Sequence, residues 1–472
     1  MQISLQRISL LFDAGSFVDH HPAEESHFIC GGGFINSVKS FLIMNRGQDC
    51  TFRGSGQWRT AKQIISTVAQ ARAQRSPLIY VQDHPGKPGT FDTTKVLSPD
   101  MSRLLLSPTG MGKVSASLAE LAQTSLLISA ILGPTSGPLA LPIMLADLVL
   151  MTQKGALCMG RPDMVKAMLA EQSDLYSLGG TEVHYRGSGS VQLAFKDESS
   201  LFECVRSLLG GIGKDRAKAT LEYEEPDAVD FGKLIPADHR MPYDMHHVLR
   251  SFIDKGSLTE LSAEYAREAL TGYARIEGHL VAIVANNPRY SGGAIHRKSA
   301  AKMAKMINIA AKTRMPILFI ADIPGFMIGR EAEISGIFSG AAELFRAHVR
   351  CNVPKLLLVA RKAYTGGVYA MCGPGFDPVA VLAYPRAHIG VFSPDTMNKV
   401  MSGADEVTRD TIRKLADEIE NPELLKADGL ITDVIRIEET RQQVVRYLFP
   451  TEATRDPLSH KGLKVLRRPA IR

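Results

Sequence analysis

The sequence predicts an α/β protein built from two similar halves, and three observations lead to this prediction. Apolar runs of strand length, such as ILFIADI and KLLLVA, stop abruptly at glycine-containing loops, as buried parallel strands do. Segments with helical periodicity, Lys62–Gln74 and Lys302–Thr313, precede the strands LIYVQ and ILFIADI, each of which begins after a proline. The order helix, strand and D-x-P-G turn occurs twice, which is typical of an internal duplication.

The first copy of this pattern ends in the turn Asp83–Gly86 and the second in Asp322–Gly325. A second glycine loop follows each turn, GPTSG at 133–137 and TGG at 365–367, and these paired loops favour duplication over chance recurrence. Between the copies, the acidic and proline-containing stretch Leu221–Met241 has no apolar period and is typical of a linker. We therefore expect domains at residues 1–225 and 240–472.

The elements after this linker follow from the same patterns. Residues Tyr243–Ser257 have an amphipathic helical period, and GYARIEGHLVAIVANNP predicts two strands joined as a hairpin. From Thr408 the chain is predicted to be helical, with a short strand in GLITDVI and a final helix in ETRQQVVRYLF.

Composition excludes several classes of protein. A chain of 472 residues exceeds one ordinary core, and its net charge of +6 is spread over a large surface. That charge and a single tryptophan, Trp58, argue against nucleic-acid binding but are compatible with a polyanionic thioester ligand. The six cysteines form no C-x-x-C pair, so we expect no metal site and a reducing cytoplasmic compartment.

One segment, Leu126–Leu150, is long and apolar enough to imitate a membrane span. Glycines and prolines interrupt it, from Gly133 to Pro142, and broken backbone at membrane depth needs protein cover. We expect a buried strand, a loop and a second apolar element instead. The N-terminus has no small-residue cleavage site of the kind that ends a secretory signal.

Several motifs in order resemble the carboxyltransferase (beta) subunit of biotin-dependent acyl-CoA carboxylases, of which this chain looks like a divergent member. In the second half they are TGYARIEGHLVAIVANNP, PILFIADIPGFMIG, KAYTGGVYAMCG, AYPRAHIGV and NPELLKADGLITDVIRIEETR. In the first half they are QRISLLFDAGSFVDH, DCTFRGSGQW, GPTSGPLALPIMLAD and GGTEVHYRGSG. The last of these contains His184 and Ser188, and a histidine in such a turn is more often structural than a general base.

The resemblance implies two crotonase-like domains, which are spirals of ββα repeats. The first would bind the acyl-CoA, and the second would bind carboxybiotin carried by a biotin carboxylase and carrier subunit. It also implies a homo-oligomer, either a dimer or a hexamer, in which the active site lies between protomers. A hetero-oligomer with a paralogue is the other assembly expected.

The carboxybiotin side is expected at the second TGG loop. Carboxyl transfer develops negative charge on the ureido oxygen of biotin, and backbone N–H groups can stabilise it. We expect the amides of Gly366 and Gly367 to do so, with Tyr364 and Thr365 shaping the loop and Gly325 and Phe326 also binding the cofactor. By itself, TGG would more often be a tight turn that lets a helix pack on the sheet, but the longer match favours the cofactor role.

The acyl-CoA side is expected at Ser136, Gly137 and Pro138, with Gly137 in a catalytic role. Here the chain departs from the family, since Pro138 replaces a glycine and has no N–H to donate. DHPGKPG also replaces the family's D-S-G-G-A-R segment, so the substrate is expected to be unusual. Arg297 and Lys302 could contact CoA phosphates, or could belong to a solvated helix face.

Three other functions stay open on the sequence. A scaffold subunit paired with an active paralogue would explain Pro138 and the changed loop. The reverse reaction, in a biotin-dependent decarboxylase, would use the same residues. A crotonase-like hydrolase or isomerase would need one oxyanion hole rather than two, and the TGG loop counts against it.

Overall fold

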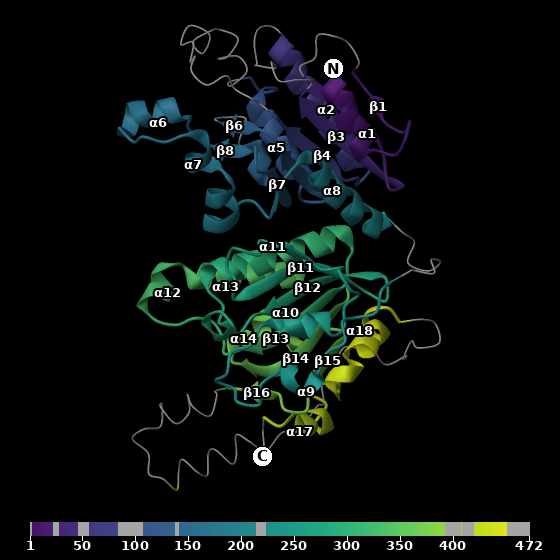
Figure 1. Ribbon diagram of the computed structural model, residues 1–472, viewed down its shortest axis with the longest axis vertical. Coiled ribbons are helices and arrows are strands. Elements are labelled where there is room, and N and C mark those ends of the chain that lie inside the picture. Colours follow the sequence, from purple (N-terminus) through teal and green to yellow (C-terminus); the bar gives the residue numbers. More distant parts are fainter. Residues whose placement is uncertain are drawn as a thin grey trace. The chain divides into compact units, whose positions relative to one another are not determined.

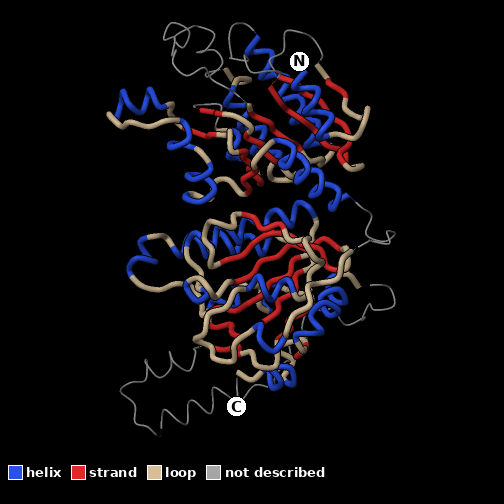
Figure 2. The backbone as a smooth tube through the Cα atoms, in the orientation of Figure 1, coloured by secondary structure: helices blue, strands red, loops and turns tan. Residues whose placement is uncertain are grey.

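The computed structural model describes residues 2–21, 28–45, 56–83, 107–136, 141–213, 223–391, 407 and 420–450. The chain divides into two compact units, Met1–Ala217 and Lys218–Arg472 (Figure 1). In both units, helices pack on a twisted sheet (Figure 2). No helix among the described residues is both long and apolar enough to cross a membrane.

The first unit contains a sheet with the strand order β1-β2-β3-β4-β5-β7-β9. The first two pairings are antiparallel and the following ones are parallel. The elements of this unit are α1 (Gln2–Leu11), β1 (Val18–Asp19), β2 (Phe28–Ile35), β3 (Val38–Asn45), α2 (Gly56–Ala73), β4 (Leu78–Gln82), α5 (Met111–Leu121), β5 (Leu127–Ile131), β6 (Pro134–Ser136), η2 (Pro142–Leu145), β7 (Leu148–Thr152), β8 (Ala156–Cys158), α6 (Pro162–Leu169), α7 (Leu175–Gly179), η3 (Glu182–Gly187), β9 (Leu193–Phe195) and α8 (Glu198–Gly213).

The second unit contains a sheet with the strand order β10-β11-β12-β13-β14-β15-β17, and β16 pairs with the end of β14. Its elements are α9 (Phe231–Leu234), α10 (Met245–Arg250), β10 (Thr259–Leu261), β11 (Ala269–Ile276), β12 (His279–Asn286), η4 (Ser291–Gly293), α11 (Arg297–Thr313), β13 (Ile317–Ile323), α12 (Arg330–Ile334), α13 (Ile337–Arg350), β14 (Lys355–Tyr364), α14 (Gly366–Ala370), η5 (Pro374–Phe376), β15 (Ala380–Ala383), β16 (His388–Gly390), α17 (Pro422–Ala427), β17 (Asp433–Val434), η6 (Ile437–Glu439) and α18 (Thr440–Leu448).

The two sheets have the same strand order and the same sequence of antiparallel and parallel pairings. In both units, a residue at the second glycine loop takes part in a parallel strand pairing. In the first, Ser136 of β6 pairs with Cys158 of β8, and in the second, Tyr364 of β14 pairs with Gly390 of β16. This agreement supports the predicted duplication.

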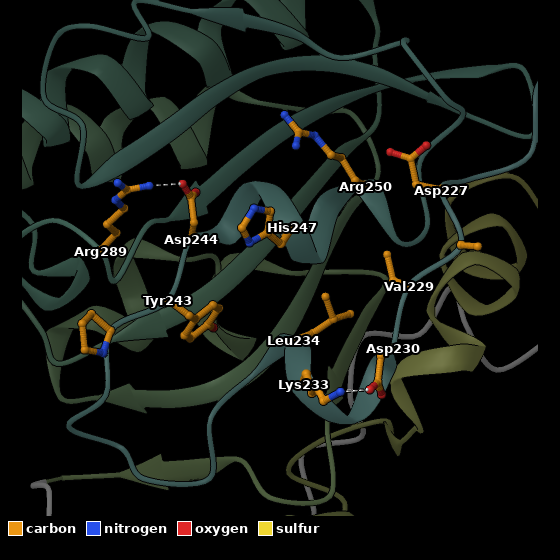
Figure 3. Close-up of a pocket in the computed structure, with 12 residues that line it drawn as sticks. Asp227, Val229, Asp230, Lys233, Leu234, Tyr243, Asp244, His247, Arg250 and Arg289 are labelled. Atoms are coloured by element: carbon orange, nitrogen blue, oxygen red, sulfur yellow. Dashed lines mark hydrogen bonds and ion pairs between the residues drawn. The ribbon is translucent and has the colours of Figure 1, made fainter.

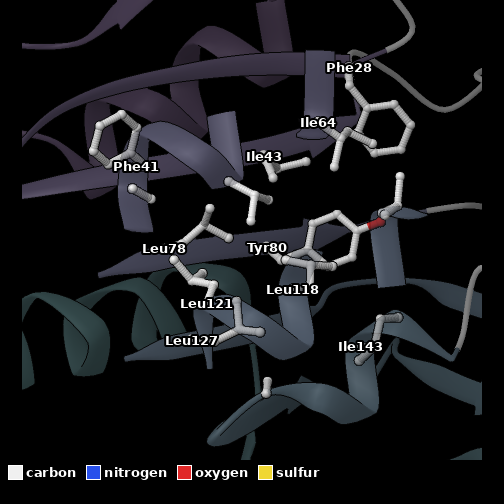
Figure 4. Close-up of a cluster of buried hydrophobic side chains, with 14 of the residues drawn as sticks. Phe28, Phe41, Ile43, Ile64, Leu78, Tyr80, Leu118, Leu121, Leu127 and Ile143 are labelled. Atoms are coloured by element: carbon white, nitrogen blue, oxygen red, sulfur yellow. The ribbon is translucent and has the colours of Figure 1, made fainter. Parts of the chain in front are cut away.

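The core of the first unit lies between the sheet and helices α2 and α5. Tyr80 of β4 is fully buried there among Phe28, Ile64 and Leu118 (Figure 4). Burial raises the pKa of its phenol well above the usual range. The corresponding core of the second unit includes Phe252, Ile283, Leu318, Leu356 and Leu382.

The predicted elements differ from the structure in extent. The segment 126–150 forms β5, β6, η2 and β7 in its described part. Strands β5 and β7 are buried in the first unit, as expected, whereas Leu141, Met144 and Leu145 at the connecting turn are exposed. Helix α10 is shorter than predicted for 243–257, while α11 begins five residues earlier than predicted, after His296 at its N-cap. Described residues of the expected linker, 223–241, belong to the second unit and include α9.

Candidate functional site

Two turns of the second unit lie against each other where the parallel strands β13 and β14 end. A Cβ atom added to Gly325, after β13, would lie 2.9 Å from Oγ1 of Thr365, after β14. One added to Gly367 would lie 3.2 Å from the Cα of Gly325 and 3.2 Å from Cδ1 of Ile323. A larger residue at either position would force its neighbours to shift, and Gly325 also has a φ of 129°, which other residues rarely adopt.

Thr365 holds the second turn in an unusual backbone conformation, with φ 48° and ψ −133°. Positive φ is strained for a β-branched residue, and such strain persists only where surrounding contacts impose it. The Thr365 amide donates to the Gly390 carbonyl of β16 at 3.0 Å, which fixes the turn. Helix α14 then begins at Gly366, so the amides of Gly366 and Gly367 have no carbonyl of that helix to bind.

Phe326 completes this group of residues. A Cβ atom added to Gly366 would lie 3.3 Å from the Phe326 ring, so the ring packs directly against the turn. The backbone on both sides of Phe326 is fixed, since Ile295 donates to the Gly325 carbonyl at 3.1 Å and Met327 donates to the Ile295 carbonyl at 2.8 Å. The structure therefore brings together all six residues predicted for the carboxybiotin side, including the buried Tyr364.

A buried ion pair supports both strands beneath the two turns. Nε of Arg361, in β14, donates to Asp322, in β13, at 2.9 Å, and neither side chain is more than 3% exposed. Nη1 of the same guanidinium donates to the carbonyls of Asp238 and Met241 at 3.0 and 2.9 Å. These bonds explain why the expected linker belongs to the second unit. Burial raises the pKa of Asp322, although Lys362 and Arg361 oppose the shift.

The sequence singled out the D-x-P-G turns but missed their arginine partners. In the first unit, Asp83 occupies the place of Asp322, and Arg7 donates to it at 2.6 Å. Glu198 also accepts from Arg7 at 2.6 Å, and the Asp83 amide donates to Asn45 at 3.1 Å. No sequence signal connects Arg7 to Asp83, because 76 residues separate them.

The acyl-CoA side is described only in part. Ser136 ends β6 and is half-buried, whereas the predicted residues Gly137 and Pro138 lie outside the described residues, as does the DHPGKPG loop beyond Asp83. A Cβ atom added to Gly133 would clash with Oδ1 of Asp83, so the residues that follow β5 and β4 lie close together.

Lys302 and Arg297 are both held by other parts of the second unit. The buried ammonium group of Lys302 donates to the carbonyls of Ser262, Tyr265 and Ala269 at 2.7–2.9 Å, and burial lowers its pKa to about 8. Arg297 lies 3.4 Å from the carboxylate of Glu343. These contacts count against the predicted phosphate role of Lys302, which faces protein carbonyls rather than solvent.

His184 lies in the first unit, where the π-helical turn η3 meets β8. Its Nε2 is 2.6 Å from the Leu157 carbonyl, and its Nδ1 is 3.2 Å from the Ser188 hydroxyl. Both ring nitrogens are therefore occupied by local contacts, as expected for a structural histidine. Among the described residues, no cluster of His, Cys, Asp or Glu is placed to hold a metal ion.

The second unit also contains a cavity of about 910 Å³ that the sequence did not indicate (Figure 3). Its walls come from α9, α10 and the segments beside them, and they carry ion pairs between Arg289 and Asp244 (3.1 Å) and between Lys233 and Asp230 (2.9 Å). Tyr243 connects this cavity to the buried ion pair, because its ring centroid lies 4.8 Å from the Arg361 guanidinium. No residue predicted for either side of the site lines it.

Comparisons with known proteins agree with this architecture. The family model of the carboxyl transferase domain matches residues 1–455. The uncharacterized carboxylase YngE of Bacillus subtilis is 31% identical over 407 residues, which cover 83% of this chain and 77% of that protein. The methylmalonyl-CoA carboxyltransferase 12S subunit of Propionibacterium freudenreichii is 26% identical, over 88% of this chain and 80% of that subunit.

Among solved structures, transcarboxylase 12S with methylmalonyl-CoA and methylmalonic acid bound superposes with a TM-score of 0.80 at 24% identity. The match covers 99% of this chain and 91% of that one, and it confirms the predicted crotonase-like α/β fold. The predicted resemblance is also confirmed, and the chain belongs to the carboxyl transferase family of biotin-dependent acyl-CoA carboxylases.

Proposed function

We propose that this chain transfers a carboxyl group from carboxybiotin, carried on a separate biotin carboxyl carrier subunit, to the α- or vinylogous γ-carbon of an acyl-CoA. The observation that carries the proposal is the contact between the two turns of the second unit, together with the start of α14 at Gly366, which leaves the amides of Gly366 and Gly367 without a carbonyl of that helix to bind. An anion at this position would find two preorganised donors.

When bound, carboxybiotin supplies the carboxyl group and leaves negative charge on its ureido oxygen. The chain's own residues then have separable tasks. The N–H groups of Gly366 and Gly367 would hold this charge, and the strained Thr365 would keep them oriented. Gly325 and Phe326 would form the wall against which that turn packs. Because Arg361 and Asp322 join the strands beneath, the donors would need little rearrangement during transfer.

We assign the acyl-CoA thioester to the first unit, around Ser136, Gly137 and Pro138. A proline at Pro138 removes one backbone donor, and the loss of one such donor typically lowers kcat on the order of a hundredfold. The proposal is therefore that this chain acts on a non-standard acyl-CoA. If Pro138→Gly raises the rate with common acyl-CoAs, then proline weakens the oxyanion hole for the thioester carbonyl. An unchanged rate would mean that another group supplies the missing donor.

The names of relatives support the substrate class without deciding the substrate. They include a putative propionyl-CoA carboxylase beta chain of Bacillus subtilis, 27% identical, and a 3-methylcrotonyl-CoA carboxylase beta1 subunit of Mycobacterium tuberculosis, 28% identical. The alpha subunit of methylmalonyl-CoA decarboxylase from Propionigenium modestum is 26% identical over 97% of this chain. That relative favours decarboxylation as the second candidate function, with the same residues used in the reverse direction.

For the assembly we propose a cytoplasmic homo-oligomer in which residues 1–225 bind acyl-CoA and residues 240–472 bind carboxybiotin. The description of transcarboxylase 12S as a hexamer supports a hexamer here as well. A hetero-oligomer, in which this chain is a catalytically impaired scaffold beside an active paralogue, is the alternative that Pro138 favours.

The deciding experiment is to purify the complex from its native source, probe it for a biotinylated subunit and measure incorporation of labelled bicarbonate into a panel of acyl-CoAs. Incorporation that requires the biotinylated subunit is expected. Gly367→Pro should abolish it, because proline removes one of the two amides, while Gly375→Ala at an exposed position should not. A complex without biotin, or transfer that survives Gly367→Pro, would contradict the proposal.

A further inference from the structure

His348 connects helix α13 to the short helix α14 from inside the core of the second unit. The side chain is 0% exposed, and its Nε2 lies 2.9 Å from the carbonyl oxygen of Ala370, the last residue of α14. Its ring is packed between Phe319 and Phe376, with centroids 5.1 and 4.9 Å away. The imidazole therefore binds the helix that carries the two amides of the proposed oxyanion site.

This hydrogen bond completes the end of α14. The carbonyls of Gly367, Val368 and Tyr369 accept from the backbone amides of the turn that follows, at 2.8–3.2 Å. The Ala370 carbonyl accepts from His348 instead. A helix of five residues has few internal hydrogen bonds, so a bond from the core to its last residue contributes strongly to its orientation.

An imidazole is energetically costly to bury at this position. Burial is the main reason that the pKa of His348 is lowered to about 4. The charge of Lys355 also lowers it, whereas the bond to Ala370 raises it. The ring is therefore neutral near pH 7. A neutral ring has one N–H, which the bond to Ala370 uses, and Nδ1 has no hydrogen-bond partner in the described part of the chain. Phenylalanine would fill the same space without leaving a buried nitrogen unpaired.

We propose that His348 is a positioning residue for carboxyl transfer: its N–H holds the C-terminal end of α14 so that the amides of Gly366 and Gly367 stay directed at the developing negative charge. This inference rests on the proposed function of the TGG turn. It assigns to His348 no contact with substrate or cofactor.

The test compares His348→Phe, which keeps an aromatic ring but loses the donor, with His348→Gln, which keeps a donor of similar reach. In the holo-complex, His348→Phe should lower kcat by roughly tenfold to a hundredfold, because small displacements of catalytic donors have effects of this size. The KM for acyl-CoA should change less than about threefold, since the proposal assigns that ligand to the other unit. His348→Gln should recover most of kcat.

Hydrogen–deuterium exchange provides a readout that does not depend on activity. The peptide 364–373 should exchange roughly tenfold faster in His348→Phe, since one hydrogen bond fewer restrains α14, and near the wild-type rate in His348→Gln. His279→Phe is the matched control, because His279 lies against Phe449 (4.4 Å between centroids) in the same unit and should change neither measurement.

Unchanged exchange and unchanged kcat in His348→Phe would overturn the positioning role, as would an equal loss in His348→Gln. If His348→Phe does not fold, His348→Asn replaces it, because its shorter side chain cannot reach the Ala370 carbonyl; equal exchange rates for the Asn and Gln variants would then refute the inference. If the wild-type complex transfers no carboxyl group, while α14 still exchanges faster in His348→Phe, the proposed function alone would be refuted.

Discussion

Gly367→Ala is the substitution that tests the contact between the two turns most directly. It keeps the backbone N–H, so any loss of activity must come from the added methyl group. That methyl would lie 3.2 Å from the Cα of Gly325 and 3.2 Å from Cγ1 and Cδ1 of Ile323, a separation tighter than ordinary van der Waals contact. The Cα of Gly325 is a backbone atom in a turn that is held by the hydrogen bond from Ile295, so α14 must shift by a few tenths of an ångström.

The size of the effect follows from this forced shift. Overpacking in a well-packed region costs about 1–3 kcal/mol, which we expect as a modest loss of stability. Misalignment of one oxyanion donor lowers kcat on the order of a hundredfold. Gly366→Ala should have a smaller effect, about threefold to tenfold, because its methyl would meet the edge of the Phe326 ring at 3.3 Å and a side chain can rotate away.

The assay is labelled bicarbonate incorporation by the holo-complex at saturating acyl-CoA, with the unfolding midpoint measured for each variant. Gly375→Ala is the matched control, since a Cβ atom there would have no atom within 4 Å. We expect kcat to be highest in Gly375→Ala, lower in Gly366→Ala and lowest in Gly367→Ala. If Gly367→Ala were as active as Gly375→Ala, the close approach of the turns would have no part in catalysis.

Three further predictions concern stability. Lys302→Met should lower the free energy of unfolding on the order of 2–5 kcal/mol, because it leaves buried carbonyls unpaired. It should not raise the KM for acyl-CoA. A raised KM would instead support the predicted contact between Lys302 and a CoA phosphate. Gly112→Ala, in α5 with open space around its added methyl, should stabilise the chain by roughly 0.5–1 kcal/mol in chemical denaturation. The pKa of His348 is about 4 in the folded chain and near 6.5 in the unfolded chain, so the unfolded chain binds a proton at a higher pH. The free energy of unfolding should therefore fall by about 3 kcal/mol between pH 6.5 and 4. Parallel pH curves for wild type and His348→Phe would contradict this prediction.

Much of the candidate site could be predicted from the sequence because its determinants are local. Gly325, Thr365, Gly366 and Gly367 follow directly on apolar strands, and parallel strands end at the same edge of a sheet. The order of strands and turns was therefore sufficient to place the two turns near each other. The sequence could not predict how closely they approach, since that depends on the register of β13 against β14, which contains an irregularity between Ala321 and Ile323.

The sequence by itself determined the α/β class, the repeated order of elements and the residues of the TGG turn, because periodicity and glycine positions are properties of neighbouring residues. Only the tertiary structure decided what each buried polar group binds. Arg361 meets Asp322 across 39 residues and His348 meets Ala370 across 22, while Lys302 turned out to face carbonyls 33–40 residues away rather than solvent. Such partners are set by how strands align and helices cross, and a hydrogen bond forms only where that packing places a donor and an acceptor within reach.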